Sequence, residues 1–173
     1  DSENQICSLE YIKFKEKTTL FERLDDFIKY MDTLSSALGL ENSEHKIEHI
    51  SREEPLKKFK GRFSNADTIQ KLTFMNAMIS GYLYRKFGTV PRYYNVNTAR
   101  KTAFPDLKIP QSAPNKKYII WENVVEREPQ INWKYSKRTH KLMKENFDMS
   151  DAYVCGLCDI ITREKTQKNI SKD

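Results

Sequence analysis

Apolar residues recur at helical spacing in two stretches of the first half of the chain. The first stretch, residues 20–34, follows Thr19 and Glu22, which together form a capping box. The second stretch, residues 69–82, follows Ser64, whose side chain can cap a helix. Each stretch ends shortly before a glycine, as helices commonly do. We therefore predict two amphipathic helices here.

Three further stretches mix β-branched, aromatic and polar residues in the manner of strands. They are residues 6–14, residues 46–53, which end before Pro55, and residues 89–96. The strand at residues 46–53 has weak periodicity and is inferred from its context. Strands that alternate with helices favour a mainly parallel sheet covered by helices. The pattern therefore predicts an α/β fold.

The second half of the chain predicts shorter helices and a long loop. Asn97 can cap a short helix that runs through Lys101, whereas residues 104–115 contain three prolines and predict a loop. Apolar positions within residues 118–125 predict a further helix, which Pro129 ends. The stretch that follows, up to residue 147, is polar and basic without periodicity.

A last helix is expected to begin near Asp148 and to direct Ala152, Cys155 and Ile161 inward. The lysine-rich tail at residues 163–173 is expected to be disordered. A chain of 173 residues has the usual size of one domain, which we place at residues 1–162.

Composition and charge narrow the function classes. No apolar run is long enough to span a membrane, and the acidic N-terminus does not resemble a secretory signal. We therefore expect no membrane partner and a cytoplasmic protein. The net charge of +6 and the pI near 9.1 favour an anionic partner. Basic residues gather with aromatic ones at residues 57–62 and 134–144.

Three cysteines, Cys7, Cys155 and Cys158, make an odd count, which fits a reducing compartment. Cys155 and Cys158 could provide half of a zinc site, but a structural zinc needs four ligands. The three histidines are not paired at ligand spacing. We therefore interpret the two cysteines as core residues.

The first candidate for chemistry is the segment that contains Glu53 and Glu54. These carboxylates end a predicted strand, where α/β folds place their sites, and a basic, glycine-containing loop follows. Such a loop could hold a phosphate backbone beside a metal-binding acid. Alternatively, the segment is a charged loop on a solvent-exposed edge. Taken alone, the sequence of this segment favours that alternative.

The second candidate is the pair Asp148 and Asp151, which share one face in the first turn of the last predicted helix. Their like charges repel unless something positive lies near them, and a divalent cation would meet that need. Alternatively, Asp148 caps the helix and Asp151 complements the helix dipole. The pair taken alone favours this second explanation.

Five short motifs in this order resemble the RuvC-like Holliday junction resolvases of the RNase H-like superfamily, especially those of bacteriophage type. They are LFERL at residues 20–24, EEP at 53–55, SNADT at 64–68, NTARK at 97–101 and DMSDA at 148–152. The resemblance spans residues 1–161. It implies an RNase H-like fold, in which helices flank a mixed central sheet.

The resemblance also implies a metal-dependent endonuclease that cuts branched DNA, as a homodimer. In this family four acidic residues hold two Mg²⁺ or Mn²⁺ ions, and the match carries these roles onto Glu53, Asp148 and Asp151, with Glu54 as an adjacent candidate. Carboxylate oxygens are the ligands that Mg²⁺ prefers, and two ions can activate a water and stabilise the leaving oxygen of a phosphodiester.

The sequence departs from the family at its start. If residues 6–14 are the third strand of the sheet, the first two strands and the Asp on the first strand are missing. Asp1 is no substitute, because no apolar segment precedes it. We therefore expect a shortened or processed chain, or strands supplied by another polypeptide. As it stands, the domain should be a poor or inactive nuclease.

The predicted DNA contacts lie in the two basic stretches and in the NTARK motif. Arg100 and Lys101 are expected to open a helix whose amides favour phosphate, and Trp133 or Tyr135 could stack on an unpaired base. The predicted contacts are Lys57, Lys58, Phe59, Lys60, Arg62, Arg100, Lys101, Lys137, Arg138, His140 and Lys141.

Two alternatives remain open at this point. The chain could be a catalytically inactive RNase H-like module that binds DNA, which the missing first Asp favours. It could also be an RNase H-like nuclease that acts on linear DNA or on an RNA–DNA hybrid. A titration of binding against salt and a panel of substrates would separate these cases.

Overall fold

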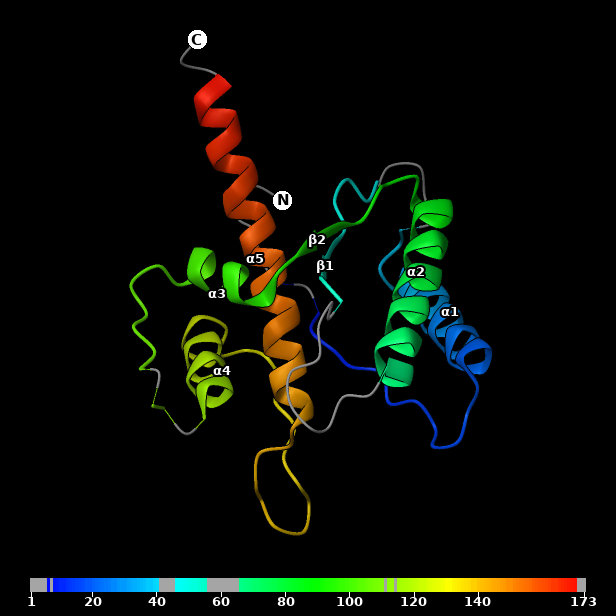
Figure 1. Ribbon diagram of the computed structural model, residues 1–173, viewed down its shortest axis with the longest axis horizontal. Coiled ribbons are helices and arrows are strands. Elements are labelled where there is room, and N and C mark those ends of the chain that lie inside the picture. The colour runs from blue at the N-terminus through cyan, green and yellow to red at the C-terminus, as the bar shows by residue number, and fades with distance from the viewer. Residues whose placement is uncertain are drawn as a thin grey trace. The chain divides into compact units, whose positions relative to one another are not determined.

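The computed structural model describes residues 6, 8–40, 46–55, 66–110, 112–113 and 115–170 (Figure 1). Within these ranges the fold is mixed α/β, as the sequence predicts. The helices are α1 (Leu20–Ala37), α2 (Ala66–Phe87), α3 (Val96–Ala103), α4 (Lys116–Arg127) and α5 (Glu145–Ile170), and the strands are β1 (Ser51–Glu53) and β2 (Arg92–Tyr94). None of the described helices combines the length and the apolar character needed to cross a membrane.

Two compact units divide the chain. One unit is Ile12–Tyr93, and the other joins Asp1–Tyr11 to Tyr94–Asp173. The predicted single domain at residues 1–162 stays a prediction. Several predicted residues lie outside the described ranges, and nothing further follows for them: Cys7, Lys57, Lys58, Phe59, Lys60, Arg62 and Ser64.

The unit at Ile12–Tyr93 is built around α1 and α2, which pack side by side (Figure 1). The capping box predicted for α1 is present. The backbone N–H of Thr19 donates to Glu22 Oε2 at 2.6 Å, and the N–H of Glu22 donates to Thr19 Oγ1 at 3.2 Å. Phe27 of α1 meets Tyr82 of α2 edge-to-face, with 6.0 Å between ring centroids. Both predicted helices are confirmed.

Strands β1 and β2 form a two-stranded parallel sheet, and α2 connects them in the sequence. The pairing includes a bond of 2.8 Å from the Arg92 N–H to the Ile50 carbonyl. Arg52 of β1 donates to the Asn76 carbonyl of α2 at 2.8 Å and to Asn76 Oδ1 at 2.6 Å. Burial of Arg52 against α2 lowers its pKa. These bonds fix the end of β1, where Glu53 lies.

The predicted strand at residues 6–14 is wrong, because none of its described residues belongs to a strand. Its alternating pattern has another cause: Leu9 and Tyr11 are partly buried against the core of their unit, while Ser8 and Glu10 are exposed. A strand also needs a neighbouring backbone to pair with, which side-chain alternation alone does not provide. The other two predicted strands are shorter than expected, with three residues each in β1 and β2.

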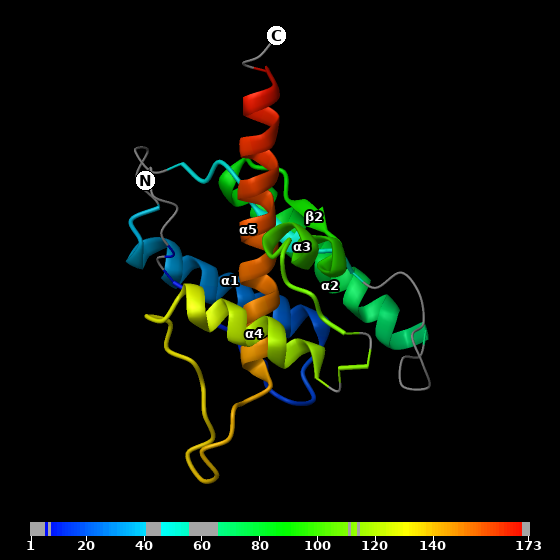
Figure 2. The same ribbon diagram turned by 90° about the vertical axis from the view of Figure 1, so that its left-hand side faces the viewer.

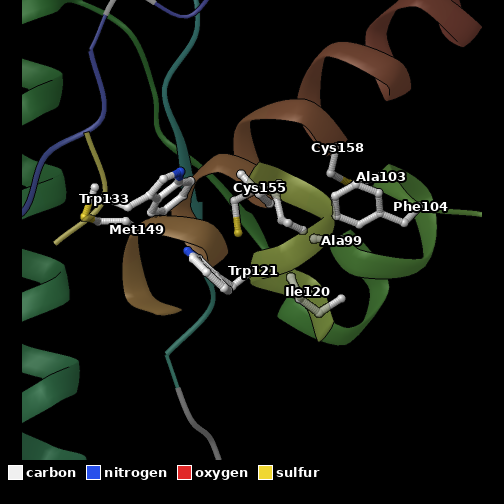
Figure 3. Close-up of a cluster of buried hydrophobic side chains, with 11 residues drawn as sticks. Ala99, Ala103, Phe104, Ile120, Trp121, Trp133, Met149, Cys155 and Cys158 are labelled. Atoms are coloured by element: carbon white, nitrogen blue, oxygen red, sulfur yellow. The ribbon is translucent and has the colours of Figure 1, made fainter. Parts of the chain in front are cut away.

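The other unit is built on α5, against which α3 and α4 pack (Figures 1 and 2). Its core is a cluster of buried side chains from these three helices and the adjoining loops (Figure 3). The cluster consists of Ala99, Ala103, Phe104, Ile120, Trp121, Val124, Trp133, Met149, Val154, Cys155 and Cys158. Cys155 and Cys158 are each 2% exposed, so their interpretation as core residues is confirmed.

Helix α5 runs to Ile170, so the predicted disorder is wrong for residues 163–170. Arg163 continues the helix with an ion pair to Asp159 one turn earlier, at 2.9 Å. Asp159 is buried and also accepts a bond of 2.6 Å from the hydroxyl of Tyr94. The prediction of disorder relied on the low hydrophobicity of this tail. It overlooked that the residues beyond Arg163 include Glu, Lys and Gln, which are good helix formers.

The core around α4 gives a first prediction. Ile120 is 1% exposed, so Ile120→Ala removes packed atoms and should lower the free energy of unfolding by about 2–5 kcal/mol. Glu122→Ala on the exposed face of the same helix should change it by less than about 0.5 kcal/mol. Urea denaturation followed by circular dichroism measures both. Equal effects of the two substitutions would show that α4 does not pack as described.

Candidate active site

The acidic pair predicted from the sequence lies at the start of α5. Asp148 is the fourth residue of this helix, which begins at Glu145. Its predicted role as the helix cap is therefore wrong: bonds from the N–H groups of Asn146 and Phe147 to the carbonyls of Met143 and Lys144 start the helical turn earlier. The side chain of Asp148 is 77% exposed, whereas that of Asp151 is 8% exposed.

Arg100 of α3 holds the buried carboxylate of Asp151. Its Nε donates to Asp151 Oδ1 at 3.1 Å, and its Nη2 donates to the same oxygen. Both side chains are largely buried, with 16% and 8% of their surfaces exposed. A carboxylate taken out of water needs such a partner, because its charge is otherwise costly to bury. The pair thus fixes α3 to α5 at the acidic site.

Lys117 of α4 brings a second positive charge to the aspartates. Its Nζ lies 3.6 Å from Asp148 Oδ1 and 3.7 Å from Asp151 Oδ2. Lysine in the first turn of a helix opposes the helix dipole, so it gains from acidic residues nearby. Sequence reasoning missed Lys117, because the helix was predicted only from residue 118, whereas α4 begins at Lys116 and puts both lysines in its first turn.

The predicted position of Arg100 and Lys101 at the start of a helix is wrong. Asn95, rather than Asn97, caps α3, because its side chain accepts a bond of 3.1 Å from the Asn97 N–H. The helix therefore begins at Val96 and puts both basic residues in its last turn. Only the N–H groups in the first turn of a helix are available to bind an anion, so those of Arg100 and Lys101 cannot form the predicted phosphate site. Lys101 remains exposed, whereas Arg100 is engaged with the buried aspartate.

Glu53 lies at the carboxyl end of β1, as predicted, and its side chain is exposed. Glu54 follows it and is partly buried. Both belong to the unit Ile12–Tyr93, whereas Asp148 and Asp151 belong to the other unit. The proposed meeting of Glu53 with the aspartates thus stays a prediction. Among the described residues of either unit, no three His, Cys, Asp or Glu side chains form a group that could hold a metal ion.

The two aspartates nevertheless offer oxygen atoms of the kind that bind a divalent cation. Asp148 and Asp151 each direct one carboxylate oxygen at the same positive atom, Lys117 Nζ. Hard carboxylate oxygens are the ligands that Mg²⁺ and Mn²⁺ take up. Arg100 holds Asp151 Oδ1, so Oδ2 is the oxygen of this carboxylate that is not bonded to the arginine. Two carboxylate oxygens are too few for a complete metal site.

A basic hairpin connects α4 to α5 and extends away from both helices (Figures 1 and 2). Tyr135 and Leu142 form an isolated antiparallel bridge at its base. Asn146, which is fully buried, clamps this base: its Nδ2 donates to the Lys134 carbonyl at 2.7 Å, and its Oδ1 accepts from the Lys134 N–H at 2.9 Å. The hairpin is therefore anchored to the first turn of α5, beside the aspartates.

The hairpin presents four of the predicted DNA contacts to solvent. Lys137, Arg138, His140 and Lys141 are all exposed. His140 has a φ of 51°, a left-handed conformation that histidine adopts more readily than most residues, and its N–H closes the turn on the Ser136 carbonyl at 2.8 Å. The tip of the hairpin thus carries three permanent positive charges and a histidine.

The two aromatic residues of the hairpin differ in exposure, which the sequence did not show. Trp133 is 9% exposed and packs edge-to-face on Trp121, with 6.0 Å between ring centroids. It cannot stack on a base. Tyr135 is 50% exposed, so its ring is accessible to a ligand. The prediction that either residue could stack on an unpaired base is thereby narrowed to Tyr135.

A separate hollow of about 510 Å³ lies in the same unit. The N-terminal segment at Leu9, the end of α4 and the middle of α5 line it, and none of the predicted site residues does. Within it the hydroxyl of Tyr153 donates to Glu128 Oε1 at 2.8 Å. Burial and this bond raise the pKa of Tyr153 to about 12. This tyrosine therefore stays neutral at physiological pH and packs α5 against the end of α4.

No protein-family model, no curated protein and no solved structure matches the chain. A functional proposal must therefore rest on the residues and their geometry.

The Arg100–Asp151 pair gives a second prediction. Arg100→Ala leaves the carboxylate of Asp151 buried without its main partner and should lower the free energy of unfolding by about 3–5 kcal/mol. Lys101→Ala removes a charge from the next, exposed position and should have an effect below about 0.5 kcal/mol. Urea denaturation at neutral pH measures the difference. If Arg100→Ala proved as mild as Lys101→Ala, the pair would not be the anchor described.

Proposed function

We propose that the chain is a structure-selective endonuclease of the RuvC-like, RNase H-like type, which cuts branched DNA such as Holliday junctions with Mg²⁺ or Mn²⁺. One observation carries the proposal: carboxylate oxygens of Asp148 and Asp151 face a single cationic atom at the foot of an anchored, exposed basic hairpin. Acidic residues able to hold a metal and basic residues able to hold phosphates are thus neighbours in one unit. The five motifs in family order support the same function.

In this proposal Asp148 and Asp151 hold the metal, and Glu53 at the end of β1 completes the ligand set, with Glu54 as the adjacent candidate. A bound divalent ion would supply an activated water and charge stabilisation for the leaving oxygen. Arg100 keeps the carboxylate of Asp151 in place by binding its other oxygen. The RNase H-like arrangement, a mixed central sheet flanked by helices, belongs to the proposal, with β1, α2 and β2 as its described part.

The hairpin provides the proposed DNA contact. Lys137, Arg138 and Lys141 are placed to neutralise phosphates, and His140 can add a hydrogen bond. Tyr135 lies between this basic tip and the start of α5, where its exposed ring can stack on a base that a branch leaves unpaired. The need to cut two strands of a junction favours a homodimer.

A second candidate function is a DNA-binding module without catalysis. It is favoured by the ion pair in which Arg100 occupies one oxygen of Asp151, since a structural ion pair also accounts for this buried aspartate. Both candidates use the hairpin in the same way. They differ only in whether the aspartates support cleavage.

Cleavage of a four-way junction distinguishes the two candidates. The full chain with Mg²⁺ should cut the junction slowly, because no residue of the sequence matches the family's first catalytic Asp. The double variant Glu53→Gln, Asp148→Asn should lose this cleavage by at least about 100-fold, because both substitutions remove proposed metal ligands. Asp106→Asn, an exposed aspartate in the loop after α3, is the matched control and should cut normally. Junction binding should persist in all of these proteins.

Cleavage that survives the double variant excludes the proposed mechanism. Binding without cleavage by the unchanged chain, at every Mg²⁺ and Mn²⁺ concentration, favours the binding module instead.

The hairpin gives a further prediction. Replacing Lys137, Arg138 and Lys141 together with Ala should weaken junction binding and reduce the slope of log affinity against log salt by about 0.9 for each lost phosphate contact. A control with the same charge change replaces three exposed lysines of the other unit, Lys13, Lys15 and Lys29. Filter binding between about 50 and 200 mM salt measures both slopes. Equal losses in the two triple variants would mean that net charge, and not the hairpin, binds the DNA.

A further inference from the structure

The basic hairpin between α4 and α5 is a narrow two-stranded element. Its strands are joined by the Tyr135–Leu142 bridge and by a bond of 2.9 Å from the Ser136 N–H to the Lys141 carbonyl. A two-stranded hairpin is at best marginally stable in water unless a further element supports it. The order of its exposed tip, residues 137–141, therefore depends on what holds its base.

Asn146 of α5 supports the base in the way that a third strand would. Its side-chain amide donates to the Lys134 carbonyl and accepts from the Lys134 N–H, as a peptide group of a neighbouring strand does. Trp133, the preceding residue, is buried against Trp121 (Figure 3). Two consecutive residues thus fix one strand of the hairpin, while the other strand continues into α5.

The amide of Asn146 is specifically required at this position. The residue is fully buried, and a buried polar group is costly unless it is hydrogen-bonded. An apolar side chain at position 146 would leave the Lys134 N–H without its acceptor, which carries a similar cost. The two bonds therefore match the chemistry of both partners.

We propose that Asn146 is a positioning residue that preorganises the hairpin for binding nucleic acid. Because it is fully buried, it acts through the hairpin and does not contact DNA itself. An arm that is ordered before binding avoids the entropic cost that a loose arm incurs on binding. This inference rests on the proposed function, because it requires the hairpin to be the DNA contact. It adds that the affinity depends on a buried clamp as well as on the charges of the tip.

Hydrogen exchange of the full chain without DNA tests the clamp directly. The amides of Lys134 and Ser136 should exchange at least about tenfold more slowly than in an unstructured chain, because both are hydrogen-bonded in the ordered hairpin. Exchange of both at the unstructured rate would overturn the proposal, since the hairpin would then not be ordered before binding.

Asn146→Ala should remove this protection, whereas the buried α5 residues Val154 and Cys155 should keep theirs. Filter binding should show an affinity for the four-way junction that is about tenfold weaker, because the tip must then be ordered on binding. The slope of log affinity against log salt should change by less than about 0.9, the value for one phosphate contact, because every charge is retained. A loss of charge contacts would instead lower the slope.

A second variant loosens the hairpin beyond the clamp and leaves α5 untouched. Ser136→Pro removes the N–H that bonds to the Lys141 carbonyl, and it should weaken junction binding to a similar extent with the same salt slope. Asn123→Ala is the matched control. The Asn123 side chain donates to the Ile119 carbonyl of its own helix at 2.8 Å, so its loss should leave junction affinity within about twofold.

The positioning role is refuted, while the proposed DNA contact stands, if Asn146→Ala or Ser136→Pro folds and binds the junction as tightly as the unchanged chain. It is also refuted if Asn123→Ala weakens binding equally, or if the salt slope falls by one contact or more. If the unchanged chain does not bind the junction, the proposed function itself fails, whatever hydrogen exchange shows for the hairpin.

Discussion

The buried carboxylate of Asp151 is the constraint on which the site depends. A charge that is removed from water must be compensated by the protein, and here Arg100 of α3 does so with two nitrogens on one oxygen. That compensation fixes α3 against α5 and leaves the other carboxylate oxygen directed at Lys117 of α4. The three helices of this unit thus meet at one acidic residue. The apolar cluster beneath them, which includes Ala99, Ile120 and Met149, keeps the arrangement rigid.

The same helix start also anchors the basic hairpin. Asn146 precedes Asp148 by half a turn and holds both backbone groups of Lys134, so the hairpin and the aspartates are fixed by adjacent residues of α5. A carboxylate site repels a phosphate backbone unless positive charge lies close by. The exposed tip of the hairpin and the two cations around the aspartates provide that charge. This balance of charge supports the proposed metal-dependent site for nucleic acid.

Sequence predicted the helices well because their signals are local. The capping box at Thr19 and the periodic apolar positions of α1 and α2 each lie within a few turns of chain. The strands were predicted less well, because pairing depends on distant backbone. Residues 8–11 alternate in burial yet form no strand. The choice of Asn95 over Asn97 as a cap shifted α3 by two residues and moved Arg100 and Lys101 from its start to its last turn.

Side-chain partnerships were the hardest part to predict. Sequence placed Asp148 and Asp151 on one helix face and anticipated a positive charge near them, but it could not identify Arg100 and Lys117 as the source. These partners are 51 and 31 residues or more from the aspartates in the sequence, and only tertiary packing brings them together. The difference between buried Trp133 and exposed Tyr135 arises in the same way.

The central proposal is that Asp148 and Asp151 hold a divalent cation. A crystal structure of the Mn²⁺-loaded protein, with anomalous difference density to locate manganese, tests it most directly. The account predicts a manganese peak at the carboxylates of Asp148 and Asp151, with Arg100 still bound to Asp151. Manganese density elsewhere, and none at these two carboxylates, would contradict it.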